Sequence, residues 1–274
     1  MNASLNQKLL PIGLFDSGFG GLTVLKELVD LLPGERFIYF GDTARLPYGN
    51  KSPTAIRHFA FENAAFLLEK KIKLLVISCH TACAHAYSDL QNALPIPVLG
   101  VTAPGVDCLL KTTQTNAVAV LGTTSTINSG IIQDLLRKKQ PSLQIYPIAC
   151  PLFVPLVEEG LQSHPAAALI AEHYLARLRG TPIDSALLAC THYPLLTTVI
   201  QTTLGSTVKL ITPAKACAEQ VKQWLEENQL LNAEPTSPNC CFYVSDDPVK
   251  FQLLAKSFFV KPIEKVTLVQ NKIL

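Results

Sequence analysis

Two cysteines follow two apolar runs of this chain, and they are its residues best suited to proton transfer. Cys79 opens the run Cys79-His80-Thr81, and Cys190 opens the run Cys190-Thr191-His192, 111 residues later. A thiol between a buried strand and a helix can reach a ligand beyond the sheet, and its thiolate is a good base and nucleophile. Two such thiols from two similar units could face one substrate from opposite sides. The pattern therefore predicts chemistry shared by two cysteines.

A metal site and a disulfide are the alternatives for these thiols. Zinc binds cysteine and histidine, but on a helix over 81–93 Cys83 and His85 point about 200° apart and cannot share one ion unaided. A bond between Cys79 and Cys190 is sterically allowed, but eight cysteines in 274 residues are too few for a disulfide scaffold, and reducing conditions disfavour it. We expect no metal, a buried Cys83 thiol that faces the sheet, a solvated or hydrogen-bonded His85, and catalytic thiols whose pKa the helix N-termini lower.

The composition excludes several classes of function. With 274 residues, 48% of them hydrophobic, the chain can bury a substantial core and is long enough for two domains. A net charge of +2 without a dense basic run argues against nucleic-acid binding, and no apolar segment reaches the ~20 residues that span a bilayer. The N-terminus, which includes Asn2 and Asn6, lacks the order of a signal peptide. We expect a cytoplasmic globular protein that binds neither nucleic acid nor membrane.

Short apolar runs rich in β-branched residues alternate with longer amphipathic segments, which predicts parallel sheets covered by helices. Several of the helices begin with a cap followed by a first-turn proline, as at Ser52-Pro53 and Asp247-Pro248. The expected strands are 11–15, 37–40, 74–78, 97–101, 117–122, 186–189, 208–211 and 242–244, and the expected helices are 21–32, 53–71, 81–93, 128–139, 164–179, 194–204, 213–228 and 247–257.

The strand-turn elements recur in the same order along the chain. One strand leads into the turn 16–21 and another, 106 residues later, into the turn 122–126, and each half then carries its cysteine strand. Any α/β chain repeats strands and helices, but recurrence at offsets of 106 and 111 suggests two related units with a cleft between them. We predict an α/β fold of two similar parallel-sheet domains related by pseudo-symmetry, with the active site in the cleft. The first domain is 1–100 plus 212–274 and the second is 101–211.

The turns themselves suit a small anionic ligand. Asp16-Ser17-Gly18-Phe19-Gly20-Gly21 offers backbone amides at a helix N-terminus and a carboxylate that could hold an ammonium group. It lacks the spacing of a dinucleotide-binding motif, and a plain tight turn is the alternative. The hydroxyls of Gly122-Thr123-Thr124-Ser125-Thr126 suit a carboxylate or a phosphate equally. In the loop 42–50, Tyr48 could wall a pocket, although the composition is also that of an ordinary surface loop.

Five motifs occur in order along the chain: Ile12 to Leu22, Gly41 to Gly49, Ser78 to Ala82, Cys150 to Gly160 and Ala189 to Pro194. Together, in register, they resemble the glutamate racemase family of the aspartate/glutamate racemase superfamily. The resemblance implies two α/β domains and a cofactor-independent racemase that supplies D-glutamate for peptidoglycan synthesis, and so for cell wall biogenesis and cell shape. Such racemases often dimerise, so a homodimer is a further expectation.

The resemblance also implies roles for single residues. Cys79 and Cys190 are the two catalysts: one thiolate removes the α-proton of glutamate while the opposite thiol delivers a proton to the other face. Asp16 assists Cys79, His192 pairs with Cys190, and Glu158 matches a family glutamate near the first cysteine. The substrate-binding residues are expected to be Asp16, Ser17, Tyr48, Gly49, His80, Thr81, Thr126, Thr191 and His192.

One position departs from the family, which usually has asparagine where this chain has His80. Histidine is bulkier and can carry charge near neutral pH, so we expect retained racemisation with altered kinetics, whether through the substrate contact or through the thiolate character of Cys79. A racemase of the same superfamily that acts on aspartate or a hydantoin is one alternative, although His192 and Pro47-Tyr48-Gly49 favour glutamate. A non-catalytic or metal-binding regulatory protein, suggested by His80 and Cys83, is the other.

Overall fold

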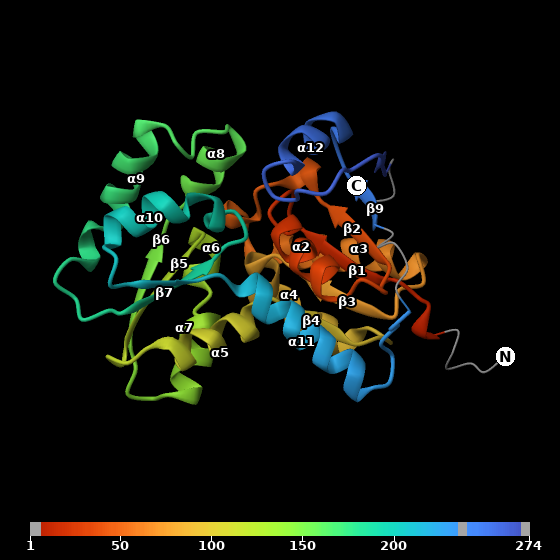
Figure 1. Ribbon diagram of the computed structural model, residues 1–274, viewed down its shortest axis with the longest axis horizontal. Coiled ribbons are helices and arrows are strands. Elements are labelled where there is room, and N and C mark those ends of the chain that lie inside the picture. Colours follow the sequence, from red (N-terminus) through yellow and green to blue (C-terminus); the bar gives the residue numbers. More distant parts are fainter. Residues whose placement is uncertain (1–6, 235–239, 270–274) are drawn as a thin grey trace.

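The computed structural model describes residues 7–234 and 240–269. It contains two sheets in which every strand pair is parallel, and Figure 1 shows them side by side, each flanked by helices. The predicted α/β class with two parallel-sheet domains is confirmed. Asn2 and Asn6, on which the expectation about a signal peptide rests, lie outside the described residues. Within the described part of the chain, no helix combines the length and apolar character needed to cross a membrane.

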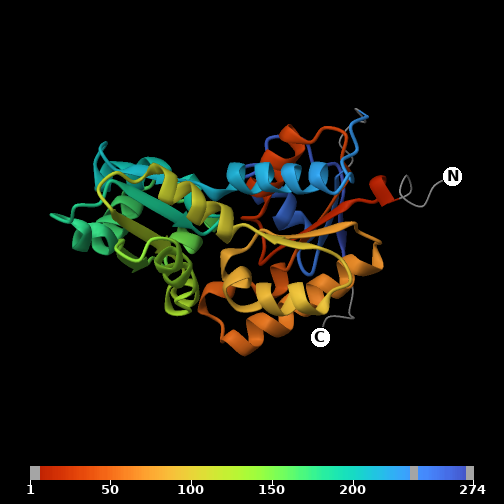
Figure 2. The same ribbon diagram turned by 90° about the horizontal axis from the view of Figure 1, so that it is seen from below.

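The larger sheet has the strand order β10-β9-β2-β1-β3-β4. Its central strands β1, β2 and β3 are completely buried, because helices cover both of its faces. Figure 2 shows α11 on one side of this sheet and the helices of residues 53–93 on the other. The elements of this unit are β1 (Ile12–Asp16), α2 (Leu22–Leu31), β2 (Phe37–Gly41), η1 (Thr43–Arg45), η2 (Tyr48–Asn50), α3 (Pro53–Glu69), β3 (Leu74–Ile77), α4 (His80–Ala93), β4 (Val98–Gly100), α11 (Pro213–Glu227), β9 (Cys240–Val244), α12 (Pro248–Ala255) and β10 (Val266–Leu268).

The smaller sheet has the order β6-β5-β7-β8. Strands β5 and β7 form its buried centre. Its elements are α5 (Thr102–Thr112), β5 (Ala117–Gly122), α6 (Thr124–Asn128), α7 (Ile131–Lys139), β6 (Gln144–Ala149), α8 (Phe153–Glu158), α9 (Pro165–Leu175), η3 (Ala176–Leu178), β7 (Ser185–Ala189), η4 (Tyr193–Leu196), α10 (Thr197–Leu204) and β8 (Lys209–Ile211).

The two sheets repeat one pattern of strand pairing. The order β2-β1-β3-β4 in the first corresponds to β6-β5-β7-β8 in the second. Ile12 pairs with Leu74 in the first sheet, and Val118 pairs with Ser185 in the second, so the registers match at the offsets of 106 and 111 seen in the sequence. The repeat places the turns that follow β1, β3, β5 and β7 at corresponding positions of the two units.

The chain passes between the two units twice, once after β4 and once after β8. Strands of the larger sheet come from 12–100 and 240–268, and those of the smaller from 117–211. Helix α11 packs on both α2 and α5, so it bridges the two units. The division into 1–100 plus 212–274 and 101–211 stays a prediction that fits this arrangement.

Several elements were not expected from the sequence, among them α6, η1 and η2 in segments expected to be a turn and a loop. Strand β6 carries Pro147, and its place at the sheet edge explains how a residue without an N–H is tolerated there. Helix α5 contains Pro104 and Gly105 in its first turn, which hid its helical pattern. The short helix α8 and the three-residue edge strand β10 are too brief for a clear periodicity.

Candidate active site

A small cavity of about 20 Å³ lies where the carboxyl ends of the two sheets meet. Its walls come from the turns after β1, β2 and β3 of one unit and after β5, β6 and β7 of the other. This volume holds about one water molecule, so the walls must separate to admit an amino acid. The lining residues are Ser17, Pro47, Tyr48, Gly49, Cys79, His80, Thr81, Thr123, Val154, Cys190, Thr191 and His192.

Cys79 caps the N-terminus of α4. The backbone N–H of Ala82 donates to its Sγ at 3.5 Å, and the Sγ lies 3.8 Å from the hydroxyl of Ser17. Burial raises the pKa of the Cys79 thiol to about 12, with a further contribution from the carboxylate of Asp16. The predicted lowering of this pKa is wrong, because the loss of hydration outweighs the favourable helix terminus.

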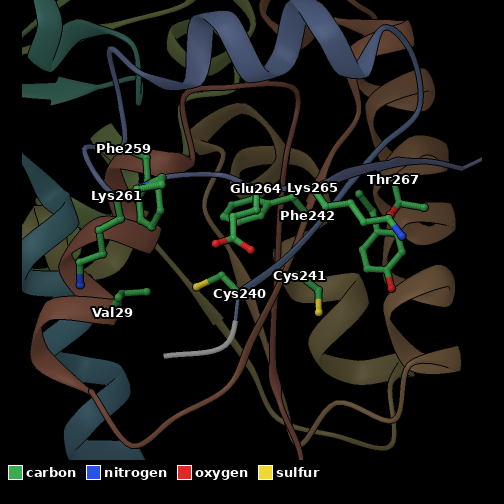
Figure 3. Close-up of a pocket in the computed structure, with 11 residues that line it drawn as sticks. Val29, Cys240, Cys241, Phe242, Phe259, Lys261, Glu264, Lys265 and Thr267 are labelled. Atoms are coloured by element: carbon green, nitrogen blue, oxygen red, sulfur yellow. The ribbon is translucent and has the colours of Figure 1, made fainter. Parts of the chain in front are cut away.

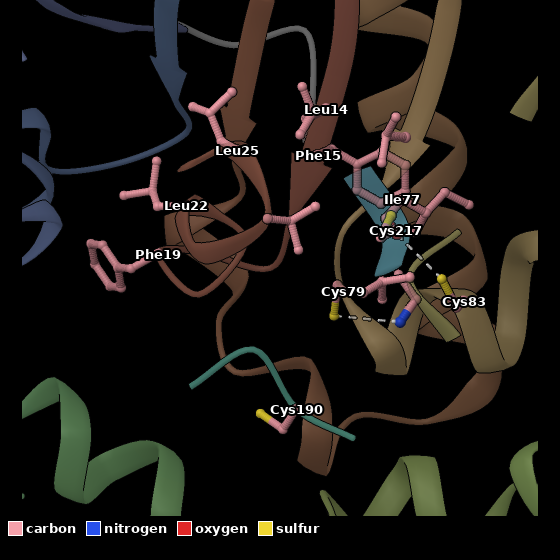
Figure 4. Close-up of a cluster of buried hydrophobic side chains, with 14 of the residues drawn as sticks. Leu14, Phe15, Phe19, Leu22, Leu25, Ile77, Cys79, Cys83, Cys190 and Cys217 are labelled. Atoms are coloured by element: carbon pink, nitrogen blue, oxygen red, sulfur yellow. Dashed lines mark hydrogen bonds between the residues drawn. The ribbon is translucent and has the colours of Figure 1, made fainter. Parts of the chain in front are cut away.

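Cys190 directly follows β7, and Figure 4 shows it on a segment that faces Cys79. Its Sγ lies 4.0 Å from Nδ1 of His192. Burial raises the pKa of Cys190 well above its usual range, the backbone N–H of His192 opposes this, and the charges of Cys79 and Asp16 add to the rise. Without a substrate, both cysteines are therefore neutral thiols at physiological pH.

His192 is held on its far side by Glu158. The Nε2 atom of His192 lies 3.1 Å from Oε1 of Glu158, and the ring of Phe258 packs edge-on against the imidazole at a centroid distance of 5.4 Å. Glu158 thus supports the side of Cys190, not that of Cys79, and its predicted position near the first cysteine is wrong. It is not among the residues that line the cavity.

Asp16 is completely buried beneath the cavity. Its Oδ1 accepts a hydrogen bond from the N–H of Gly18 at 2.9 Å, and its Oδ2 accepts one from the hydroxyl of Thr191 at 3.4 Å. Burial raises the pKa of Asp16, while the nearby His192 lowers it. The structure therefore places Asp16 behind Thr191 and outside the lining residues, and its expected contact with the substrate stays a prediction.

Three threonines form a ring of hydrogen bonds across the two units. Thr81 Oγ1 lies 3.0 Å from Thr123 Oγ1 and 2.9 Å from Thr126 Oγ1, and the latter two hydroxyls are 2.9 Å apart. Thr81 and Thr123 line the cavity, whereas the fully buried Thr126 does not and supports the other two. The predicted set therefore missed Thr123, although it stands 106 residues after Ser17, at the same place in the repeated unit.

The loop after β2 contributes a buried wall of the cavity through Tyr48, although Ala44 and Asn50 of the same loop are exposed. The hydroxyl of Tyr48 donates to Asp42 and accepts a hydrogen bond from Asn63 Nδ2 at 3.0 Å. A Cβ atom on Gly49 would stand 2.6 Å from Cβ of Thr123, so only glycine permits this close approach of the two units. Pro47, beside Tyr48, and Val154 of α8 also line the cavity; both lie within motifs of the family resemblance but were not among the predicted substrate-binding residues.

His80 lines the cavity as a neutral imidazole. Burial lowers its pKa to about 3, so the expectation of a charge near neutral pH is wrong. Its Nδ1 lies 3.1 Å from the hydroxyl of Thr102. Cys83 is buried and its thiol donates to the carbonyl of Ile77, and His85 is hydrogen-bonded to Ser125. In the described residues, no three histidine, cysteine or acidic side chains are grouped so as to hold a metal ion.

A larger cavity of about 500 Å³ lies along β9, near the β10 edge of the larger sheet (Figure 3). Cys240 and Cys241 line it together with Lys261 and Lys265. Burial raises the pKa of Cys240 to about 12, and all the residues that line this cavity belong to the first unit. The small cavity between the sheets is therefore the stronger candidate for catalysis.

Comparison with known proteins identifies close relatives over nearly the whole chain. The sequence model of the Asp/Glu/Hydantoin racemase family matches residues 12–221. The glutamate racemase of Chlorobaculum tepidum is 43% identical over 260 residues, which are 94% of this chain and 96% of the relative. That of Geobacter metallireducens is 45% identical over 247 residues, 90% of this chain and 92% of the relative. A crystal structure of glutamate racemase from Francisella tularensis in complex with D-glutamate superposes with a TM-score of 0.91 at 39% identity and covers 96% of this chain and 98% of its own.

Proposed function

The chain belongs to the Asp/Glu/Hydantoin racemase family, and on that basis we propose that it is a glutamate racemase, which interconverts L- and D-glutamate. The observation that carries this proposal is that two thiols, Cys79 and Cys190, line one cavity from two different units. An α-carbon held between them has one thiol on each face. Removal of the proton by one and delivery by the other inverts the configuration.

The proton balance of the site requires help from the substrate. Both thiols are neutral in the free protein, and one of them must lose its proton before it can act as a base. The ammonium group of glutamate brings a positive charge into a dry site, which lowers the pKa of a nearby thiol. For Cys190, His192 at 4.0 Å is the nearest proton acceptor, and Glu158 stabilises the imidazolium that forms.

The hydroxyl groups of the cavity bind the carboxylates. As the α-proton leaves, negative charge spreads onto the α-carboxylate, and fixed donors aimed at that charge lower the barrier. Thr81, Thr123 and Thr191 line the cavity from both units, and their hydroxyls become such donors when they turn from their present partners toward the substrate. Ser17 lies on the side of Cys79 and supports the thiolate that forms there.

The direct test is the formation of D-glutamate from L-glutamate by the purified protein without added cofactor, with L-aspartate and a hydantoin as competing substrates. We expect glutamate to be racemised, and Cys79→Ala and Cys190→Ala each to lower kcat by about 10²- to 10⁴-fold, since each removes a proton-transfer group. Full activity in either single variant would contradict the two-base assignment. Racemisation of aspartate but not glutamate would transfer the activity to the alternative substrate.

We further propose that the reaction takes place in the cytoplasm, where the product serves peptidoglycan synthesis, and that the protein acts as a homodimer. The family resemblance supports both statements. Light scattering of the purified protein tests the second: a mass of one chain, 29.8 kDa, across micromolar concentrations contradicts it.

A further inference from the structure

One ring nitrogen of His80 makes a hydrogen bond, and the other has no hydrogen-bond partner among the described residues. Its Nδ1 contacts the hydroxyl of Thr102, the first residue of α5, at 3.1 Å. Its Nε2 is buried and has no hydrogen-bond partner among the described residues. The side chain is 2% exposed and lines the cavity beside Cys79. A buried polar nitrogen without a partner is costly, so its retention at a ligand site indicates a use.

The hydrogen-bonding needs of Thr102 determine which nitrogen of His80 carries the proton. A threonine hydroxyl has one proton to donate. The sulfur of Cys83 is nearby but is a weak acceptor, and its own proton is directed to the carbonyl of Ile77 at 3.4 Å. Nδ1 of His80 is therefore the best acceptor for the Thr102 hydroxyl. A neutral imidazole that accepts at Nδ1 carries its hydrogen on Nε2.

This tautomer decides what His80 can bind. With Nδ1 bonded to Thr102 of α5, Nε2 is the unpartnered nitrogen of a residue that lines the cavity, and in this tautomer it is an N–H donor. Such a donor matches a carboxylate oxygen, whereas the opposite tautomer would present a lone pair suited to the ammonium group. Because burial keeps the ring neutral, the donor adds no positive charge that would compete with the ammonium.

We propose that Thr102 is a positioning residue that fixes His80 in the tautomer with hydrogen on Nε2, and that this N–H donates to a carboxylate oxygen of the bound amino acid. The inference rests on the proposed function for the identity of the ligand, but the tautomer is a property of the free protein. Thr102 does not line the small cavity. It acts on the substrate only through His80, from a helix that the sequence pattern did not reveal.

The tautomer is tested by ¹⁵N NMR of the free protein labelled at histidine, where protonated and unprotonated ring nitrogens have well-separated shifts. We expect His80, assigned by its loss in His80→Asn, to show a protonated Nε2 and a bare Nδ1 that do not change between pH 8 and 6. A protonated Nδ1, or a fully protonated ring in this range, overturns the proposal. This outcome is independent of whether glutamate is the substrate.

Kinetics test the consequence of the tautomer. Thr102→Val keeps the shape and removes the hydroxyl, and we expect kcat/KM for both enantiomers to fall about tenfold with a loss of the uniform tautomer signal. Thr102→Ser keeps a hydroxyl at this position. We expect it to return kcat/KM to within about twofold of the wild type and to restore the uniform tautomer signal. Thr112→Val, the same change at the far end of α5, is the matched control and should match the wild type.

The proposal is overturned if Thr102→Val retains both the wild-type tautomer and the wild-type kcat/KM, or if Thr102→Ser behaves like Thr102→Val. Should Thr102→Val not fold, the wild-type spectrum and Thr102→Ser still decide. Wild-type protein that racemises no glutamate at all contradicts the proposed function instead, and leaves the NMR result for His80 standing.

Discussion

The two thiols occupy corresponding places in a repeated unit, but their surroundings differ. On the first side, α4 begins directly after Cys79, so the thiol caps a 14-residue helix, and its side-chain hydrogen-bond partner within residues 7–234 and 240–269 is the hydroxyl of Ser17. On the second side, Thr191 and His192 come before η4, a four-residue 3₁₀ helix that carries Pro194. The turn formed by Cys190, Thr191 and His192 brings the imidazole of His192 back toward the thiol of Cys190.

Two cysteines that follow corresponding strands of the repeated unit therefore need not lose their protons in the same way. Burial raises the pKa of both thiols, so each needs a means of losing its proton. Cys190 has the imidazole of His192 with Glu158 behind it, whereas Cys79 has a neutral hydroxyl and the buried carboxylate of Asp16 nearby. The thiol of Cys190 therefore has an imidazole beside it as a proton acceptor, whereas the charge of Asp16 disfavours ionisation of Cys79.

The largest expected difference comes from the imidazole. His192→Asn removes the proton acceptor of Cys190 while keeping a polar side chain, and we expect kcat to fall about 10²-fold, at the low end for a group that transfers protons. The rate of racemisation is measured from the change in circular dichroism, starting from each enantiomer of glutamate. A loss of kcat of less than threefold would contradict the proposed difference between the surroundings of Cys79 and those of Cys190.

Gly20 links the first unit to the second half-site. A Cβ atom at this position would overlap Thr191 Oγ1 and stand 2.6 Å from His192 Nδ1. Gly20→Ala is therefore expected to displace His192 and to lower kcat/KM several tens of fold, because misplacement by about 1 Å can cost 10²-fold. Gly122→Ala, whose Cβ would lie 3.2 Å from the flexible end of Ile127 and at an ordinary 3.5 Å from the carbonyl oxygen of Ala189, is the control and should keep activity within about threefold. Equal losses in both variants would contradict this reason.

The hydroxyl on the side of Cys79 is expected to matter less. Ser17→Ala removes one weak contact to the thiol, at 3.8 Å, and should lower kcat/KM by less than about tenfold. L- and D-glutamate have equal free energies, so kcat/KM must fall equally for both, which checks the assay. A loss as large as that of His192→Asn would make the half-sites equivalent.

The last expected effect is on stability, not on the rate of racemisation, and concerns His80. The unfolded chain binds a proton at this residue below about pH 6.5, and the folded protein only near pH 3. Acid therefore favours the unfolded state between these values, by about 1.4 kcal/mol per pH unit for one proton. In urea titrations from pH 6 to 4, His80→Asn should lose this one-proton slope. An unchanged slope would show that His80 is charged in the folded protein.

Much of the fold and of the candidate site could be predicted from the sequence. The paired cysteines, the offsets of 106 and 111 and the alternation of strands and helices were sufficient for the fold class, whereas most of the lining, including Ser17, Thr81 and Thr191, was predicted from the family resemblance of the motifs. Thr123 could have been found by applying the first offset to Ser17.

What could not be predicted depends on packing between distant segments. The pKa values of the thiols follow from burial, which the helix-terminus argument ignored. The position of Glu158 beside His192 depends on how α8 packs against η4. The position of Thr102 beside His80 depends on α5, a helix that its proline and glycine concealed in the sequence.

The central claim is that the two thiols act on opposite faces of one α-carbon. In ²H₂O, Cys79→Ala and Cys190→Ala should each retain slow exchange of the α-proton for deuterium, detected by NMR or mass spectrometry on L- and D-glutamate separately. The account predicts that each variant exchanges only one enantiomer, and that the two variants exchange opposite ones. Exchange of the same enantiomer by both variants, or of both enantiomers by either, would contradict it.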